Sequence, residues 1–204
     1  MTATSAQGVK RRGPYARGRQ SRELILDTAL EVIGREGYTS VSLRHIAAAT
    51  DMTQAGLLHH FGTKEQLFLA VLEARDEANA NDPALSARLD GAPRTVLFAR
   101  HSVTVPGLVH LFVSLQAAAG DPNHPAHEFF LRRDADVRAR VARDIRERQS
   151  AGYFDPDVDA DDAARMIMAV SDGLQAEWAI DPTIDFVGVL SRLWEKLSGR
   201  PLPE

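Results

Sequence analysis

Apolar residues recur at helical spacing along most of the chain. Ile25, Ala29, Val32 and Ile33 place one apolar face on a helix expected over residues 21–36. In residues 125–149, apolar side chains line one side of a long expected helix, and Arg and Asp residues cover the other. No useful stretch alternates apolar and polar residues as a half-buried β-strand does. The pattern therefore predicts an all-α fold.

Residues that start and stop helices divide the chain into about nine expected helices. Ser, Thr and Asp stand at positions where helices begin, and Gly or Pro follows where they end. The expected helices cover residues 21–36, 42–50, 53–61, 63–81, 93–103, 106–119, 125–149, 159–180 and 185–198. Thr63 and Gln66 fit a capping box, in which each side chain bonds to the backbone amide of the other residue.

The composition excludes several functional classes. The chain has no cysteine, which removes disulfides, thiolate zinc sites and cysteine nucleophiles and is typical of a reducing cytoplasm. No apolar run has the length of a membrane span, and the first residues lack the apolar core of a secretion signal. We find no glycine-rich phosphate loop, nucleophile elbow or paired carboxylates. We therefore expect a cytoplasmic protein that is not an enzyme, needs no cofactor and has no membrane partner.

Charge is unevenly distributed along the chain. Residues 1–22 carry six cations and no anion, and residues 1–64 have a net charge of +4 within a chain whose total is −4. A basic end on an acidic body is expected where one end meets phosphate. Residues 1–19 can bury little, so we expect a flexible basic arm. An inert solvated tail is the alternative.

Residues 42–66 are the most informative segment. They contain a short helix, a tight turn, a second short helix and the start of a third. Two such short helices are unstable alone, so the helix over 21–36 must support them. Their expected shared core is Leu43, Ile46, Ala47, Leu57 and Phe61. This is a helix-turn-helix, and the three helices form an expected DNA-binding domain over residues 20–66.

The second helix of such a motif presents its N-terminal residues to base edges in the major groove. Here that helix begins with Gln54 and two small residues, which permit close approach. Gln54 can form paired hydrogen bonds to adenine, and Arg44 can reach a phosphate or a guanine edge. Lys64 and the helix N-terminus beside it can face a phosphate together. Next to this motif, Arg17 and Arg19 can enter the adjacent minor groove, which we favour over the inert tail.

The same segment resembles the DNA-binding domain of the TetR family of transcriptional regulators. Ser42, Ile46-Ala47, Thr53, His60-Phe61 and Thr63-Lys64-Glu65 stand in the register of the family pattern, and the resemblance covers residues 20–75. It implies DNA-facing positions at Arg44, Thr53, Gln54, Ala55, Gly56, His59, His60 and Lys64. The implied function is a repressor that binds a palindromic operator as a homodimer and is released by a small-molecule effector.

Two positions depart from the family pattern. Asp51 stands in the turn where the family usually has Gly, and Asp tolerates the left-handed backbone conformation better than most residues. Leu58-His59 replaces the usual aromatic pair. A tyrosine contact to phosphate is then lost at Leu58, and His59 can replace it, more strongly when protonated. The alternative is that His59 is simply an exposed neutral side chain.

The resemblance also implies that residues 67–204 form a helical domain for effector binding and dimerisation. We expect part of the dimer interface among Ile167, Met168, Leu174, Phe186, Leu190 and Trp194, because two helices this apolar exceed what one neighbouring layer covers. Candidate pocket residues are His101, His110, Phe112, Gln116, Phe129 and Trp178. No charged group is evident among them, so we expect a hydrophobic or weakly polar effector. Core packing is the alternative for both sets.

Two other functions remain as alternatives. His124 and His127 have a spacing that brings two side chains to one helix face, but no third metal ligand is evident. We therefore expect no metal site. An adaptor that does not bind DNA is the other alternative, and it predicts binding that ignores operator sequence.

Overall fold

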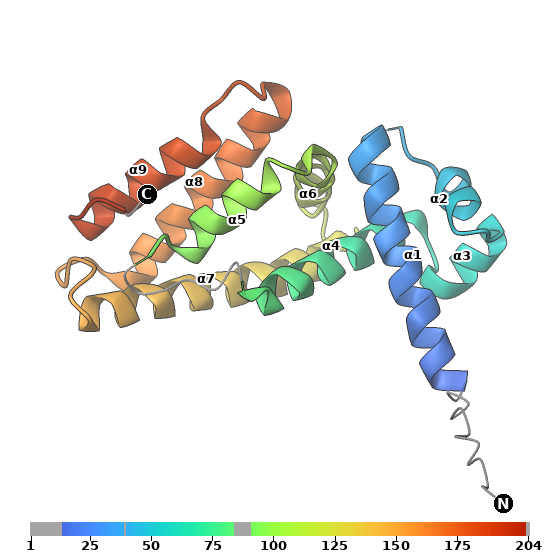
Figure 1. Ribbon diagram of the computed structural model, residues 1–204, viewed down its shortest axis with the longest axis horizontal. Coiled ribbons are helices and arrows are strands. Elements are labelled where there is room, and N and C mark those ends of the chain that lie inside the picture. The colour runs from blue at the N-terminus through green and yellow to red at the C-terminus, as the bar shows by residue number, and fades with distance from the viewer. Residues whose placement is uncertain (1–13, 39, 84–90, 203–204) are drawn as a thin grey trace, which may run out of the picture.

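The computed structural model describes residues 14–38, 40–83 and 91–202, and these ranges contain nine helices and no strand (Figure 1). The all-α prediction is confirmed. The helices are α1 (Pro14–Glu36), α2 (Leu43–Ala49), α3 (Gln54–Phe61), α4 (Lys64–Asn81), α5 (Arg94–Ser102), α6 (Pro106–Ala118), α7 (Ala126–Ser150), α8 (Ala160–Ile180) and α9 (Phe186–Ser198). No single helix in these ranges is long and apolar enough to cross a membrane; α5 and α6 reach that length only as a pair bent by 111°.

Side-chain caps begin the helices where the sequence predicted them. Ser42 and Thr53 accept hydrogen bonds from backbone amides three residues later, at 3.3 and 3.0 Å. Both bonds of the capping box between Thr63 and Gln66 are present, at 3.1 and 3.0 Å. Asp159 and Asp185 cap α8 and α9 in the same way. These local bonds satisfy amides that have no partner within the helix.

The first helix begins earlier than expected. It starts at Pro14 instead of residue 21, so residues 14–19 of the expected arm are helical. Pro is well suited to a first helical position because the amide it lacks would have no partner there. Arg17 and Arg19 therefore belong to α1. Residues 1–13 of the arm lie outside the described residues.

The helices form an elongated arrangement in which α1, α2 and α3 make one end and α8 and α9 lie toward the other (Figure 1). The long helix α7 lies beside α4, and α5 and α6 lie between α4 and the last two helices. Helix α4 thus begins at α3 and ends within the second half of the molecule.

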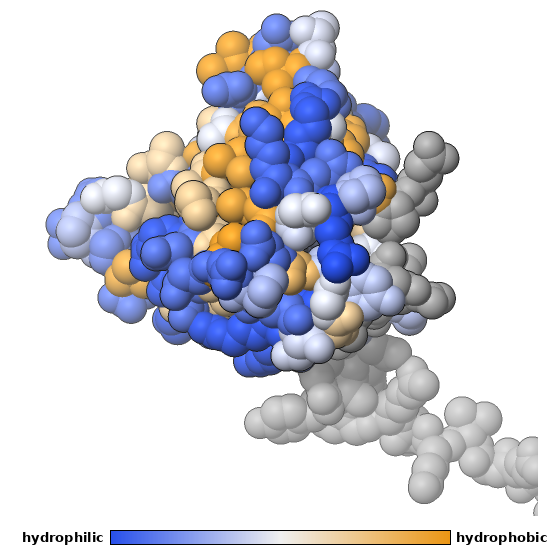
Figure 2. Space-filling model, turned by 90° about the vertical axis from the view of Figure 1, so that its left-hand side faces the viewer, coloured by the Kyte–Doolittle hydropathy of each residue, from blue (hydrophilic) through white to orange (hydrophobic). Residues whose placement is uncertain are grey.

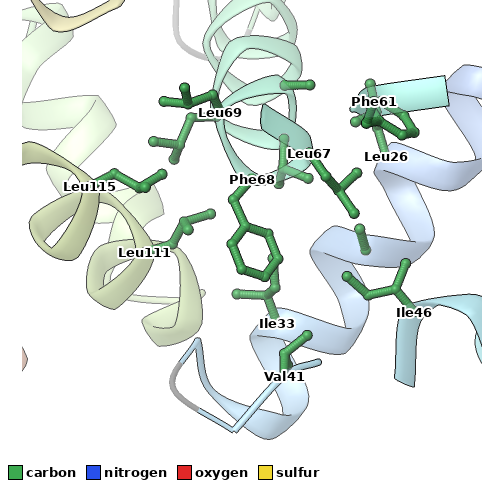
Figure 3. Packing of buried hydrophobic residues seen from close by; sticks show 14 of the residues in the cluster. Leu26, Ile33, Val41, Ile46, Phe61, Leu67, Phe68, Leu69, Leu111 and Leu115 are labelled. Atoms are coloured by element: carbon green, nitrogen blue, oxygen red, sulfur yellow. The ribbon is translucent and has the colours of Figure 1, made fainter. Parts of the chain in front are cut away.

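A continuous apolar cluster joins the two halves. Figure 3 shows Phe68 of α4 with Ile33 of α1 on one side and Leu111 of α6 on the other. Four residues of the expected small core, Ile46, Ala47, Leu57 and Phe61, are buried in this cluster, and Leu43 packs against it. The cluster crosses the expected boundary after residue 66, so α1, α2 and α3 share one core with α4 and α6.

Helices α1 and α6 approach most closely at Gly107. A Cβ atom on Gly107 would overlap the carbonyl oxygen of Ile33 and would lie 2.8 Å from Cα of Gly34. Both atoms belong to the backbone of α1, so a rotamer change cannot relieve the overlap. Only glycine fits here without moving α6 away from α1.

A second apolar cluster corrects the expected dimer interface. Ile167, Leu174, Phe186, Leu190 and Trp194 are buried in a core built from α5, α7, α8 and α9, and Met168 is half-buried. The sequence-based expectation did not include α5, which packs against α9 in addition to α8. Trp194 Nε1 donates to Thr95 Oγ1 of α5 at 2.7 Å. Within one chain these five residues pack as the core-packing alternative expects.

Candidate nucleic-acid interface and ligand cavity

The turn between α2 and α3 has the geometry that Asp51 was expected to permit. Asp51 has a φ of 53° and is the only non-glycine residue with positive φ among the described residues. The amide of Met52, immediately after it, donates to Ala47 O at 2.9 Å. Asp thus takes the left-handed role of glycine, and the turn holds α2 and α3 in a fixed relation.

The two faces of α3 differ sharply. Leu57 and Phe61 are buried against the rest of the domain. Thr53, Gln54 and Ala55 are exposed, and Gly56 is half-buried. The start of α3 therefore presents Gln54 among small residues, with no bulky side chain to keep a binding partner away.

Cationic and imidazole side chains surround this exposed helix. Arg44 of α2 is exposed, as are His59 and His60 near the end of α3. Lys64, the first residue of α4, is half-buried, with its Nζ 5.2 Å from the Phe68 ring centroid. The side chains of Arg17 and Arg19 lie outside the described part of the structure. The arrangement suits an anionic partner laid along α3.

Arg22 is a further cation at this site that sequence analysis missed. Its guanidinium lies 5.4 Å from the Phe61 ring centroid, so α1 also contributes charge beside α3. The available signal was its position four residues before Leu26, which is buried facing the same core. His45 was also missed: its Nδ1 lies 3.0 Å from Oε2 of Glu36 and links α2 to α1. Hydrogen bonding by Arg35 and the charge of His45 lower the pKa of Glu36.

A cavity of about 470 Å³ lies between α4, α5, α7 and α8. Part of its lining is apolar and includes Phe98, Val137, Val141 and Met168. Polar and charged side chains from the same helices complete the lining, among them Asp76, Asn79, Arg94, Arg133, Asp144 and Asp172. A volume of this size is typical of small-molecule sites.

The structure places none of the six expected pocket residues in the lining of this cavity. Phe112, Phe129 and Trp178 are buried in the two apolar cores, His101 is exposed and His110 is half-buried. Gln116 comes nearest, because its Nε2 donates to Asp172 Oδ2 at 2.9 Å. The charged lining also differs from the apolar or weakly polar lining that we expected.

Charged pairs define one end of the cavity. Asp76 accepts hydrogen bonds from Arg75 at 2.7 Å and from Arg133 at 2.6 Å. Burial alone would raise the pKa of Asp76, but the two guanidinium groups hold that pKa below its usual value. Arg75 itself is buried, and its guanidinium stacks over Phe98 and Phe112.

Asp172 has a different environment. Gln116 and Gln175 donate to its two oxygens at 2.9 and 3.4 Å, and no cation lies within ion-pair distance of it among the described residues. Burial raises the pKa of Asp172. The Nδ2 atom of Asn79, also in the lining, is buried without a hydrogen-bond partner in the described ranges. Two polar groups of this cavity therefore lack a full set of partners within the described part of the chain: Asp172 has no cation in direct contact, and Asn79 Nδ2 has no hydrogen-bond acceptor.

The two histidines considered as metal ligands serve the start of α7. His124 Nδ1 accepts from the backbone amide of Ala126 at 3.1 Å, and His127 Nδ1 lies 2.8 Å from Ala119 O. Within the described residues, no group of three or more His, Asp or Glu side chains is placed to hold a metal ion. These contacts give both histidines a structural role.

Two family models match the chain. The model described as bacterial regulatory proteins, tetR family, matches residues 25–71. The model described as BetI-type transcriptional repressor, C-terminal, matches residues 106–189. The first contains α2, α3 and the start of α4, and the second extends from the start of α6 into α9.

Curated relatives match the chain over shares that range from 28% to 77% of its length. The transcriptional repressor AcnR of Corynebacterium efficiens is 40% identical over 58 residues, which cover 28% of this chain and 30% of that protein. The chain thus aligns with about a third of the length of the first such relatives. The transcriptional regulator TcmR of Streptomyces glaucescens is 29% identical over 163 residues, covering 74% of this chain and 68% of that protein.

Solved structures share the fold over most of the chain. A TetR transcription regulator from Haloarcula marismortui superposes with a TM-score of 0.70 at 19% identity, covering 88% of this chain and 98% of that one. A putative transcriptional regulator from Saccharomonospora viridis, solved in complex with choline, superposes with a TM-score of 0.66 at 21% identity. The match covers 87% of this chain and 95% of that one. The transcriptional regulator FadR from Bacillus subtilis, solved in complex with stearoyl-CoA, superposes with a TM-score of 0.59 at 17% identity. The match covers 86% of this chain and 97% of that one.

Proposed function

The chain belongs to the TetR family of regulatory proteins, and we propose that it is a sequence-specific DNA-binding repressor released from its operator by a small-molecule effector. The observation that carries this proposal is the exposed start of α3, where Gln54 stands among small residues with Arg44, Arg22 and Lys64 around it. A regulator of this kind needs no catalytic group.

We assign the residues around α3 to two kinds of DNA contact. Gln54 reads base edges, with Thr53, Ala55 and Gly56 permitting close approach in the major groove. Arg44, His59, His60 and Lys64 contact phosphates or base edges beside it. Arg17, Arg19 and Arg22 follow one another along the start of α1 and extend the phosphate contacts.

We propose a homodimer that binds a palindromic operator, with an interface different from the one first expected. Met166, Ala169, Gly173 and Ile180 lie at helical spacing on the exposed side of α8. Exposed apolar side chains gathered on one face favour a protein interface. Figure 2, which views the end of the molecule that carries the α7–α8 connection, shows an apolar strip between hydrophilic surfaces. A twofold axis through α8 would pair two recognition helices with two half-sites.

We assign the effector to the cavity between α4, α5, α7 and α8. Neighbours of this fold are in complex with choline and with stearoyl-CoA, so the fold accepts ligands of different polarity. The charged lining favours a ligand with a polar group over the hydrophobic one first expected. Because α4 extends from α3 to this cavity, a ligand that prefers another position of α4 changes the spacing of the recognition helices.

Selection of genomic fragments with the purified full chain tests the proposed function. At moderate salt, the retained fragments should share an inverted repeat with half-sites about one DNA turn apart or somewhat more. Gln54→Ala should still retain fragments but with a weaker motif. Retention without a common motif would favour the adaptor alternative and contradict the proposal.

A further inference from the structure

We propose that the cavity between α4, α5, α7 and α8 binds a small organic cation whose protonated nitrogen contacts Asp172. The inference deepens the proposed function, because it names the chemical class of the effector. It rests on the charges of the cavity lining, on where those charges are buried, and on the apolar surface between them.

The carboxylates of the lining differ in their partners. Asp76 is paired with Arg75 and Arg133, and Asp144 accepts from Arg148 Nε at 3.0 Å. Asp172 receives only amide hydrogen bonds, from Gln116 and Gln175. Asp172 is partly buried, and a carboxylate in such a place with no cation in direct contact is costly to keep charged. Asp172 is therefore the acidic group in this cavity that gains most from a positively charged ligand.

The cations of the lining do not favour an anionic ligand to the same extent. Arg140 and Arg143 are exposed on α7, so water already solvates them and a surface ion pair adds little. Arg94 donates to the backbone oxygen of Asn79, and Arg133 is occupied by Asp76. An anion at this site would also approach Asp172, whose direct hydrogen-bond donors are two neutral amides and whose charge is offset only in part by the nearby Arg133.

The apolar residues of the lining indicate what kind of group the ligand carries on its charged nitrogen. Phe98, Val137, Val141 and Met168 contribute apolar surface to the lining beside the charged groups. A cavity of about 470 Å³ holds a molecule of modest size. An alkyl or aryl group on the charged nitrogen would cover this apolar surface, and the aromatic ring of Phe98 also suits a neighbouring cation.

Isothermal titration of the full chain with butylammonium, hexylammonium and benzylammonium chloride tests the proposal. Butyrate, hexanoate and benzoate at the same ionic strength are the matched anions. We expect at least one ammonium ion to bind with a Kd below about 10 mM and at least about tenfold more tightly than its matched anion. Tighter binding of the anions, or no binding by any ammonium ion at this concentration, would overturn the proposal.

Asp172→Asn and Asp136→Asn separate a specific contact from a general charge effect. Asn is close in shape to Asp and can still accept from Gln116, so Asp172→Asn should fold. It should weaken ammonium binding at least about tenfold, or about 1.4 kcal/mol. Asp136 is exposed on α7, one of the helices that border the cavity, but it is not part of the lining, so Asp136→Asn should bind as the original chain does. Equal binding by both variants would overturn the assignment to Asp172.

A separate measurement of operator binding distinguishes this inference from the proposed function. If an ammonium ion binds through Asp172 but leaves DNA affinity unchanged, the ligand class stands and the effector role fails. If the chain binds its operator but no ammonium ion binds, the regulator stands and the ligand class fails.

Discussion

Arg133 of α7 donates through Nε to Oδ2 of Asp76 of α4 at 2.6 Å, across a sequence separation of 57 residues. The other oxygen of Asp76 accepts from Arg75, the preceding residue on α4. One carboxylate thus holds two guanidinium groups, and the more buried of these stacks on Phe98 and Phe112. The ion pair between Asp76 and Arg133 connects the second half of α4 to α7 at the cavity lining.

Asp76→Asn should destabilise the chain by about 3 kcal/mol at neutral pH, because it leaves two largely buried guanidinium groups without their anion. The pKa of Asp76 is lowered in the folded state. Its stabilising effect is therefore present above the unfolded pKa of about 4 and is lost as pH falls through the folded value. Urea unfolding of the variant should differ most from the original chain at neutral pH and less in acid. Asp136→Asn is the control.

Lys64→Ala and Gln54→Ala should weaken DNA binding in different ways. Loss of a phosphate contact at Lys64 should lower the affinity for all sequences alike. In a plot of log affinity against log salt concentration, the slope should become shallower by about one. Loss of the paired hydrogen bonds from Gln54 should relax base preference at one position of each half-site, costing about 1–3 kcal/mol on the preferred base. Fluorescence anisotropy with matched and mismatched operators measures both. Equal loss of specificity in the two variants would contradict the assignment.

Gly173→Gln should make the monomer more stable and the dimer weaker. A Cβ at Gly173 meets nothing within 4 Å in the chain itself, so the substitution creates no clash there. Replacing a mid-helix glycine improves helix stability by roughly 0.5–1 kcal/mol. At an interface through this side of α8, the longer side chain would hold two helices apart. Light scattering over a concentration series should show more monomer; an unchanged dimer would place the interface elsewhere.

Gly107→Ala should cost about 1–3 kcal/mol of folding stability, because its Cβ overlaps the backbone of α1. Gly173→Ala, compared at a protein concentration at which the chain is monomeric, is the matched control, because within the single chain it adds the same methyl group in open space and should stabilise α8. Thermal unfolding of both variants measures the difference. A Gly107→Ala protein as stable as the original would show that α6 can move away from α1 without loss.

Local signals in the sequence were sufficient for the helices and for the turn of the DNA-binding motif. The capping box at Thr63 and the left-handed Asp51 depend on bonds or dihedral angles within a few residues. The positions of Gln54 and Arg44 on exposed faces follow from the burial of Leu57 and Ile46 on the opposite faces. The start of α1 was missed because residues 14–20 carry little apolar signal.

The second half could not be assigned in the same way. An apolar face shows that a residue is covered, but not which element covers it, so Trp194 was placed at an interface when α5 covers it. The cavity depends on pairs such as Asp76 and Arg133 that are distant in sequence. The charged side chains of the cavity come together only when α4, α5, α7 and α8 pack. The spacing of residues within one helix does not show which residues of another helix will lie beside them.

The contact between Gly107 and the backbone of α1 has an evolutionary consequence. A joint formed by main-chain atoms makes few demands on the side chains of its neighbours, so substitutions around it can accumulate while the two helices keep their spacing. Residues that line the cavity between α4, α5, α7 and α8 would be free to vary without changing this contact, because none of them belongs to α1 or α6. The spacing of α1 and α6 would then be restricted mainly at Gly107.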